Sequence, residues 1–369
     1  MNNEGKFGLI ETISIVTIVI VSKILFTSES VVVDFVGTAA WYMTLLSCFT
    51  SIIFFLILYI LMKRFPGKNL IEIFQLVTGK IVGKLLGFLF ALYFLYYAGS
   101  NLREFIEMIK AYSYPYTATS LFLVTFIIVT LLLSYKGLEN IARISYITLI
   151  IFIIGISTIL LLALPNANFL YLRPYLGYGV KSTLYYGLLR SSSYDEIIIL
   201  ALIIKSVHGL KNFKIAGLIS LGIAGLVSSI SLVIYLAIFQ HDMGAENLSG
   251  MFQISRTIYF NIYFQRLESI FLFTWVITSL VTVSIGFYVS ISTYCKTFNI
   301  ADHRPLLLPF SFLMYIIALK PKDISEIIYT NMAIVREYSG MLLYLVPTLV
   351  LIIAFITNKR GVVNNEEKA

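Results

Sequence analysis

Tyr178 to His208 reads YGVKSTLYYGLLRSSSYDEIIILALIIKSVH, and this stretch decides the fold. Two apolar, helix-compatible runs, 181–189 and 197–204, flank the polar residues RSSSYDE at 190–196. The three charges and four hydroxyl groups between them are stable at bilayer depth only where they face protein or water. Non-helical backbone is tolerated at that depth only where it lines a cavity. The stretch therefore predicts a membrane helix broken in its middle, and the alternative is a long loop between two ordinary spans.

The polar centre of this stretch is a candidate binding segment. A half-helix beginning near Ser193 would present its unpaired backbone N–H groups to a cavity, where such groups bind anions. Transporters with discontinuous helices hold their substrates in this way. Arg190 is assigned as a coupling or structural charge, and the candidate substrate-binding residues here are Ser191, Ser192, Ser193, Tyr194, Asp195 and Glu196.

The composition places the chain in a membrane. Of the 369 residues, 59% are hydrophobic and only 12% are charged, and the mean hydropathy is +0.90. Soluble chains have about 25% charged residues. Because apolar runs of spanning length recur from end to end, we predict an all-α, polytopic membrane protein. No cleavable signal peptide is expected, because the first apolar run is as long as a span and lacks a small-residue cleavage site.

About ten spans are predicted, with an interfacial amphipathic helix at 69–80. A polar segment at 240–264 is expected outside the bilayer, with a helix within 248–259. The spans form a single transmembrane domain, residues 1–357, which a polar tail, 358–369, follows. The predicted spans are 9–27, 39–62, 81–109, 120–134, 141–164, the broken sixth segment, 215–239, 267–294, 306–319 and 341–356.

The basic residues give the orientation. Of the 27 Lys and Arg, 16 fall on the side of the N-terminus and 8, Arg336 among them, on the other side. The remaining three, Lys23, Arg103 and Arg190, lie within spans. Basic residues are enriched in cytoplasmic loops, so both termini are expected in the cytoplasm, which agrees with an even number of spans.

Lys23 lies well inside the first span, next to Ser22. A bare ammonium group there costs about 3 kcal/mol on insertion scales, so it must snorkel to the span end, pair, or face water. In a central cavity it would pair with Asp195 or Glu196, fill a cation site or hold a substrate carboxylate. Since the first and sixth spans both carry an internal charge, we expect them to be the interrupted first helices of two inverted five-helix halves. Ser22 and Lys23 are therefore candidate substrate-binding residues.

Five further charges are assigned coupling or structural roles. Arg103, Glu104 and Glu107 share the third span, and Arg103 and Glu107 are four residues apart, so these two are expected to neutralise each other. This cluster marks either a span end or an outer gate. Arg266 and Glu268 open the eighth span, and their spacing of two points them to different helix faces.

Motifs of soluble enzymes are absent: the sequence has no phosphate-binding loop, no GxGxxG, no CxxC and no HExxH. The three histidines lie at span ends or in loops, so neither a metal site nor a cofactor is predicted. The +8 net charge is not a nucleic-acid signature, because most lysines and arginines sit at span ends. Catalysis is therefore not expected, and any chemistry falls to the intramembrane polar groups.

An ordered set of segments over nearly the whole chain resembles the B subunits of nutrient germinant receptors, the GerAB-type spore germination permeases. These belong to the amino acid–polyamine–organocation (APC) transporter superfamily. In the last of the segments, Leu267 stands where the family signature has an aromatic residue. The segments are LREFIEMI at 102–109, LENIAR at 138–143, YLRPYLG at 171–177, YDE at 194–196, and QRLES at 265–269 followed by Trp275.

The resemblance implies an APC-like fold and a place in the inner spore membrane, a bacterial cell membrane. It implies that a small nutrient, an amino acid, binds between the first, third, sixth and eighth spans, with Glu196 starting the second half of the broken helix. It also implies an A-type partner with a cytoplasmic domain and a lipoprotein C-type partner. The superfamily usually breaks its first span with small residues, whereas the matching positions here are Ser22-Lys23-Ile24.

Three functional hypotheses remain open from the sequence. The first is a nutrient-sensing, permease-like subunit of a germinant receptor, in which an occupied cavity changes the tilt of the two halves. The second is a proton-coupled secondary transporter of amino acids or polyamines, with coupling through Glu196 or Lys23. The third is a structural membrane subunit whose cavity is vestigial.

Overall fold

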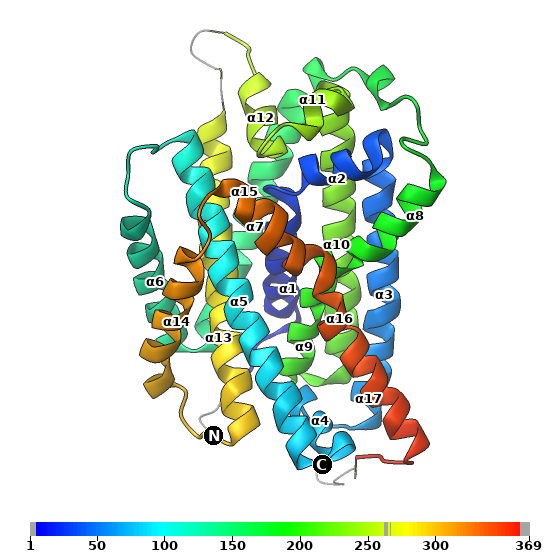
Figure 1. The fold of residues 1–369 in the computed structure, drawn as a ribbon, viewed down its shortest axis with the longest axis vertical. Coiled ribbons are helices and arrows are strands. Elements are labelled where there is room, and N and C mark those ends of the chain that lie inside the picture. The colour runs from blue at the N-terminus through cyan, green and yellow to red at the C-terminus, as the bar shows by residue number, and fades with distance from the viewer. Residues whose placement is uncertain (1–4, 262–264, 266, 362–369) are drawn as a thin grey trace.

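The computed structural model describes residues 5–261, 265 and 267–361, and within them the secondary structure is helical (Figure 1). The described part has only two isolated β-bridges, between Phe7 and Val207 and between Tyr259 and Gln265. The all-α class predicted from the sequence is confirmed. Arg266 and most of the polar tail lie outside the described residues.

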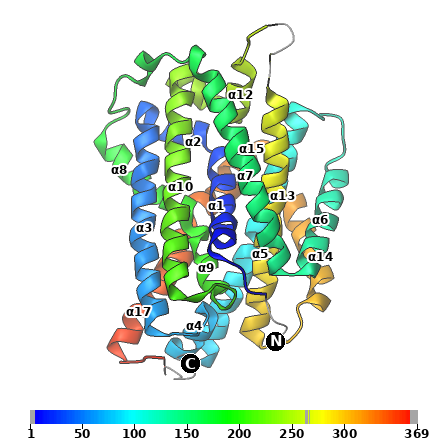
Figure 2. The same cartoon turned by 180° about the vertical axis from the view of Figure 1, so that it is seen from behind.

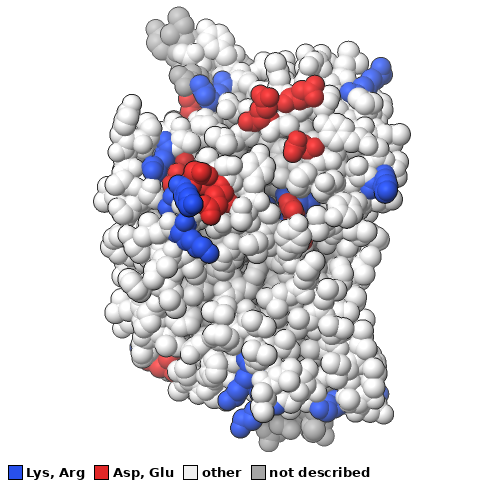
Figure 3. Space-filling view, viewed as in Figure 1, with Lys and Arg blue, Asp and Glu red and all other residues white. Residues whose placement is uncertain are grey.

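Within the described residues, seven helical segments are long and apolar enough to cross a membrane. The three other predicted spans are shorter: the first helix, the interrupted sixth segment and α14 (Leu307–Leu319). On the face shown in Figure 3, charged residues occupy the upper half and the lower end, and an uncharged band lies between them. The long uninterrupted helices are α3 (Ala40–Arg64), α5 (Lys80–Tyr112), α6 (Thr119–Lys136), α7 (Leu138–Ala163), α10 (Gly209–Ile238) and α13 (Glu268–Phe298).

Helix α1 (Leu9–Leu25) runs through the middle of the molecule, with α3 and α10 on one side and α5 and α13 on the other (Figures 1 and 2). Its side chains from Ser14 to Leu25 are all buried, which explains why its sequence is apolar all round rather than on one face. The described chain begins at Gly5 and ends at Gly361 at the same end of the bundle, next to Glu139 and Arg64.

The first span is interrupted, as predicted. Lys23 still lies in the last turn of α1, and the residues between helices are 26–28, before α2 (Glu29–Val36). In Figure 1, α2 lies across the vertical helices at the end away from the termini. The positions that match the superfamily's usual break, Ser22-Lys23-Ile24, keep the α-helix; none of them is a glycine, the residue that most weakens a helix short of proline.

The sixth segment is interrupted as predicted, but it does not unwind. Between α8 (Val180–Leu189) and α9 (Ile199–Leu202) the chain forms a 3₁₀-helix, η4 (Arg190–Ile198). Nine residues is long for a 3₁₀-helix, and such a stretch within a helix often marks a functional hinge. Serine hydroxyls compete with the α-helical hydrogen bonds and favour the change of geometry. All nine residues are buried, so the alternative of an exposed loop is wrong.

The last span begins much earlier than Met341, where it was predicted to start. A single helical segment runs from Ile324 to Ile356 and includes two π-helical stretches, η7 (Ile327–Asn331) and η8 (Ile334–Tyr338). It continues through α16 (Gly340–Leu343) and α17 (Leu345–Ile356). Arg336, which was counted in an outer loop, is therefore inside the protein and only 2% exposed. Because η8 contains polar residues, this half of the span was not recognised from the sequence.

Shorter helices cover the two ends of the bundle. The predicted interfacial helix is α4 (Leu70–Thr78), which Asn69 and Glu72 start with a reciprocal capping box. In the outer segment, α11 (His241–Ala245) and α12 (Gly250–Thr257) form, and the second matches the helix predicted there. The remaining short elements are η1 (Gly37–Ala39), η2 (Leu164–Asn166), η3 (Phe169–Leu172), η5 (Ile204–Ser206), η6 (Arg304–Leu306) and α15 (Ile324–Glu326).

Glycines allow the long helices to pack closely. A Cβ atom at Gly217 of α10 would lie 2.0 Å from the Phe55 ring of α3, and one at Gly286 of α13 would lie 2.8 Å from Tyr97 of α5. Small residues at such contacts let membrane helices approach, since lipid provides no hydrophobic force between them. These two interfaces pack α10 on α3 on one side of α1 and α13 on α5 on the other side.

Candidate functional site

Lys23 is fully buried and lies at the centre of an ion cluster. Its ammonium group is 2.5 Å from Oε1 of Glu196 and 3.2 Å from Oδ1 of Asp195. It also donates to the carbonyl oxygens of Ser192 at 2.8 Å and Val335 at 3.2 Å. The sequence left open whether Lys23 snorkels to the span end, faces water or pairs with a carboxylate. In the structure it points inward and pairs with Asp195 and Glu196.

The geometry of η4 and η8 makes this cluster possible. The carboxylates of Asp195 and Glu196, adjacent in η4, both reach the one ammonium group. The π-helical turn of η8 presents backbone carbonyls to side chains: Val335 to Lys23, residue 336 to Ser193, and residue 337 to Ser192. π-Helical turns are rare and occur frequently at functional sites. Two irregular helices thus meet across the end of α1.

Arg336 makes a second set of buried polar contacts next to Lys23. Its Nε donates to the carbonyl oxygen of Lys23 at 2.9 Å, and its Nη2 donates to Thr27 at 2.8 Å. The same Nη2 lies 3.0 Å from a carboxylate oxygen of Glu104 on α5, and Thr27 also donates to Glu104. Arg336 therefore ties the interruption of the first span to α5 and to the last helix.

Arg190 also connects the sixth segment to the last helix. Its Nη1 lies 3.4 Å from Oε1 of Glu337, and its Nη2 donates to Ser28. Ser339 adds to this connection, because its hydroxyl donates to Asp195. We call Lys23, Asp195, Glu196, Glu104, Arg190, Arg336 and Glu337 the central charge network. Counted as ionised, it holds three positive and four negative side chains.

The other residues of η4 make contacts within the protein. Ser192 donates to the Glu337 carbonyl and accepts from the Gly340 N–H. Tyr194, expected to face a ligand, is 0% exposed and its hydroxyl lies 2.8 Å from Thr44 Oγ1 on α3. Ser191 donates to the carbonyl of residue 188. The described backbone of η4 is therefore held on both sides by α3 and η8.

Ser22 does not join Lys23. It lines a different small void, of about 10 Å³, with Glu104, Ser279 and Thr282 among the other lining residues. Neighbours in sequence on an α-helix point about 100° apart, so the two residues face different walls. The two candidates that the sequence grouped together at the first span are thus separated in space.

The cluster of the third span divides into two parts. Arg103 and Glu107 form the predicted pair at 3.1 Å. Arg103 also donates to the carbonyls of Ala318 and Pro321 at the end of α14, while Glu104 turns to Arg336. Glu268 is the first residue of α13 and partly buried, and Arg266 lies outside the described residues.

Several residues of the site were not anticipated from the sequence: Thr27, Ser28, Glu29, Arg336, Glu337 and Ser339. A signal for the last three was present, since the apolar positions 327, 328 and 335 precede the predicted start of the span and continue at helical spacing into 342 and 343. The helix containing Arg336 was therefore recognisable, although its contacts were not.

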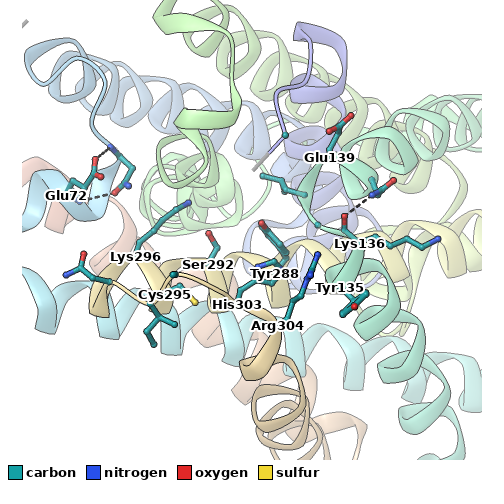
Figure 4. A pocket seen from close by; sticks show the side chains of 18 of the residues that line it. Glu72, Tyr135, Lys136, Glu139, Tyr288, Ser292, Cys295, Lys296, His303 and Arg304 are labelled. Atoms are coloured by element: carbon teal, nitrogen blue, oxygen red, sulfur yellow. Dashed lines mark hydrogen bonds between the residues drawn. The ribbon is translucent and has the colours of Figure 1, made fainter. Parts of the chain in front are cut away.

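The larger hollow of the protein lies at the end that holds the termini. It has a volume of about 330 Å³, and α4, α6, α7 and α13 contribute its walls (Figure 4). Figure 4 shows Lys296 and Ser292 of α13 across from Glu72, with His303 and Arg304 toward Tyr135 and Lys136. Two voids of about 10 Å³ each lie beside the central charge network. No group of three or more His, Cys, Asp or Glu within the described ranges is placed to hold a metal ion.

A family profile described as "Spore germination protein" matches residues 9–327. The chain belongs to this family. It is 22% identical to spore germination protein KB of Bacillus subtilis (strain 168) over 90% of this chain and 91% of the relative. It is also 23% identical to spore germination protein YndE of the same organism, over 95% and 96% of the two chains. Spore germination protein A2, again of that organism, is 22% identical over 86% of this chain and 87% of the relative.

The fold of this family member is that of a membrane transporter. A solved structure of Mhp1, a nucleobase-cation-symport-1 family transporter in a closed conformation, aligns with a TM-score of 0.62. The alignment covers 96% of this chain and 90% of Mhp1 at 12% identity. The likeness confirms the predicted transporter-type fold for a multi-pass membrane protein, and it carries no information on the ligand.

Proposed function

We propose that this protein is the nutrient-sensing, permease-like subunit of a spore germinant receptor, and that the nutrient is an amino acid. The observation that carries the proposal is the buried contact of Lys23 with Asp195 and Glu196, at the meeting point of α1, η4 and η8. Family membership supports the place in germination, and the fold supports a ligand site within the bundle.

A zwitterionic nutrient is suited to this cluster because it carries the same two charges that the cluster pairs. Its carboxylate would compete with Asp195 and Glu196 for Lys23, and its ammonium group would take over one of those carboxylates. Each exchange removes a contact between α1 and η4. A ligand that binds the loosened state better shifts the population toward it.

Partner subunits would detect this shift. We include in the proposal an A-type subunit with a cytoplasmic domain and a lipoprotein C-type subunit, both implied by the resemblance to germinant receptors. The distribution of lysine and arginine supports termini in the cytoplasm. The inner spore membrane is the location that fits a protein of this family.

The test uses spores in which this receptor is the only one present. Lys23→Met and Glu196→Gln should each abolish the nutrient response, measured as loss of optical density after nutrient addition, while immunoblots still detect the protein in the membrane. Lys181→Met and Glu139→Gln are matched controls, because both side chains lie away from the central charge network. A full response in both Lys23→Met and Glu196→Gln spores would disprove the proposed site.

A proton-coupled transporter of amino acids or polyamines is the second candidate. The excess of one carboxylate in the central charge network favours it, since a proton on one of the four would balance the three cations. Uptake of labelled amino acids or polyamines into vesicles, driven by a pH gradient and lost in Glu196→Gln, would support this function. Uptake that does not depend on the gradient would argue against it.

A further inference from the structure

Glu29 is a buried acid outside the central charge network. It is the first residue of α2, directly after the interruption of the first span, and it is 2% exposed. Neither of its carboxylate oxygens has a hydrogen-bond partner. A buried carboxylate without donors is costly, so a donor for it is expected.

Glu29 lines a void of about 10 Å³ between α2, α3, η4 and α10. Ser228 of α10 lines the same void, is fully buried, and its hydroxyl also lacks a partner. The void has the size of one water molecule or one ammonium group. Its other walls combine the guanidinium group of Arg190 with hydroxyl-bearing and apolar side chains. The hydroxyl-bearing residues are Ser28, Thr44, Ser47, Ser193 and Tyr194, and the apolar residues are Ile24, Leu25, Val32, Met43 and Leu232.

The charges around this void are arranged asymmetrically. The carboxylate of Glu29 and the guanidinium group of Arg190 both line it, but Arg190 already contacts Ser28 and Glu337. The uncompensated group is therefore negative. An ammonium group offers three N–H donors, which matches two carboxylate oxygens and one hydroxyl oxygen.

We propose that Glu29, with Ser228, binds the ammonium group of an amine-bearing nutrient. This rests on the proposed nutrient-sensing function and adds a subsite to it. The nutrient occupies this subsite before it moves on to Lys23. In this outer position the apolar wall accepts a small aliphatic side chain, and the carboxylate of an amino acid lies toward Arg190. The full ligand is larger than the void, so α2 must move away from α3 for it to enter.

The position of Glu29 makes it the outer part of the site. Helices α2, α11 and α12 lie at the end of the molecule away from the termini (Figure 1). Gly250 of α12 packs directly over it: a Cβ atom there would lie 3.1 Å from Glu29 Cβ and 2.9 Å from the Tyr235 ring. A ligand arriving from that end therefore meets Glu29 before it reaches Lys23.

The first test measures ammonium binding directly. The purified full-length protein in detergent is unfolded by heat at pH 7 in ammonium chloride, potassium chloride or tetramethylammonium chloride of equal concentration. A ligand that binds the folded state raises Tm in a saturable way. Ammonium should raise the Tm of the wild-type protein above that in the other two salts, because potassium matches its size but has no N–H donors. Equal effects of ammonium and potassium, or no effect of either, would overturn the proposal.

Substitutions locate the effect. The ammonium-dependent shift should vanish in Glu29→Gln and shrink in Ser228→Ala, and it should persist in Asp34→Asn, which removes an exposed carboxylate from the same helix. Glu29→Gln keeps the size of the side chain and removes a buried charge, so folding should be retained; Ser228→Ala is the independent check. A shift that is unchanged in both variants would overturn the proposal.

The second test uses spores and a panel of amino acids, each paired with the hydroxy acid in which OH replaces the amine. The wild-type receptor should respond to the amino acid and not to its hydroxy acid. Glu29→Gln should raise the half-saturating amino acid concentration at least tenfold, and Asp34→Asn should not change it. An unchanged value in Glu29→Gln spores, with the response still lost in Lys23→Met spores, would remove Glu29 from the site and leave the proposed function intact. Loss of the proposed function would instead show as a normal response in Lys23→Met spores.

Discussion

The ammonium group of Lys23 lies 2.5 Å from Oε1 of Glu196, and neither side chain is exposed to solvent. The two residues are 173 positions apart, on the first and sixth membrane segments. Their contact joins α1 and η4, two membrane segments far apart in the sequence. Because a buried charge is costly once its partner is removed, this point is sensitive to single substitutions.

The first prediction concerns this pair. Lys23→Met leaves Asp195 and Glu196 buried without their cation, and should lower the free energy of unfolding by about 3–5 kcal/mol. Adding Asp195→Asn and Glu196→Gln to the same protein removes the uncompensated charges, so the triple variant should recover most of the loss. Thermal unfolding in detergent measures both steps. If the triple variant is no more stable than Lys23→Met, the uncompensated carboxylates are not the cause of the lowered free energy of unfolding.

The second prediction concerns Arg336. Arg336→Gln removes the cation that faces Glu104 in the interior, and should destabilise the protein by about 3–5 kcal/mol. Arg336→Lys should recover only part of this, because one ammonium group cannot span the positions that the planar guanidinium reaches. The control is Arg143→Gln, which breaks a largely exposed pair with Glu139 and should cost less than about 1 kcal/mol. Equal destabilisation in the two glutamine variants would contradict the buried position of Arg336.

The third prediction compares two glycines of α10. Gly217→Ala should destabilise by about 1–3 kcal/mol, since its Cβ would overlap the Phe55 ring. Gly222→Ala should be neutral or stabilise by up to about 1 kcal/mol, because nothing lies within 4 Å of its Cβ and alanine favours helix. Phe55→Leu should offset part of the effect of Gly217→Ala. Unfolding midpoints of the four proteins test the packing of α10 on α3.

The fourth prediction concerns Glu72 at the end that holds the termini. Glu72 caps the start of α4 and also pairs with Lys205 after the sixth segment, at 2.5 Å. Glu72→Ala should cost about 1 kcal/mol, mostly through the lost capping box, because the half-exposed pair is worth little. Glu139→Ala removes an acidic residue from the first turn of α7 without a capping box, and should cost only about 0.5 kcal/mol or less. Midpoints that fall equally in the two variants would show that the cap is not important.

Secondary structure was predictable from the sequence wherever a helix is long and apolar. The range 81–109 falls within α5, and 215–239 passes the end of α10 by one residue, because lipid demands an uninterrupted run of apolar residues with internal hydrogen bonds. The start of the last span at 341 was wrong, because the polar residues of a buried helix were read as lying outside that helix.

The candidate site was predictable in part. Lys23, Asp195 and Glu196 stood out because charges at bilayer depth need partners, and their pairing was among the options considered. Arg336 and Glu29 did not stand out, because their burial depends on helices that cover them from elsewhere in the chain. The predicted unwound segment around Ser193 is a 3₁₀-helix, since its serines bind the carbonyls of η8.

By itself the sequence determined that this chain is a bundle of membrane helices, that the first and sixth of them carry internal charges, and that it resembles spore germination permeases. Apolar runs and isolated charges have these consequences in lipid whatever the helices contact. Only the tertiary structure decided which charges meet, that Arg336 closes the network from the last helix, and that Glu29 remains without a donor. Those facts depend on which helix faces lie against one another, and the packing of side chains far apart in the sequence sets that choice.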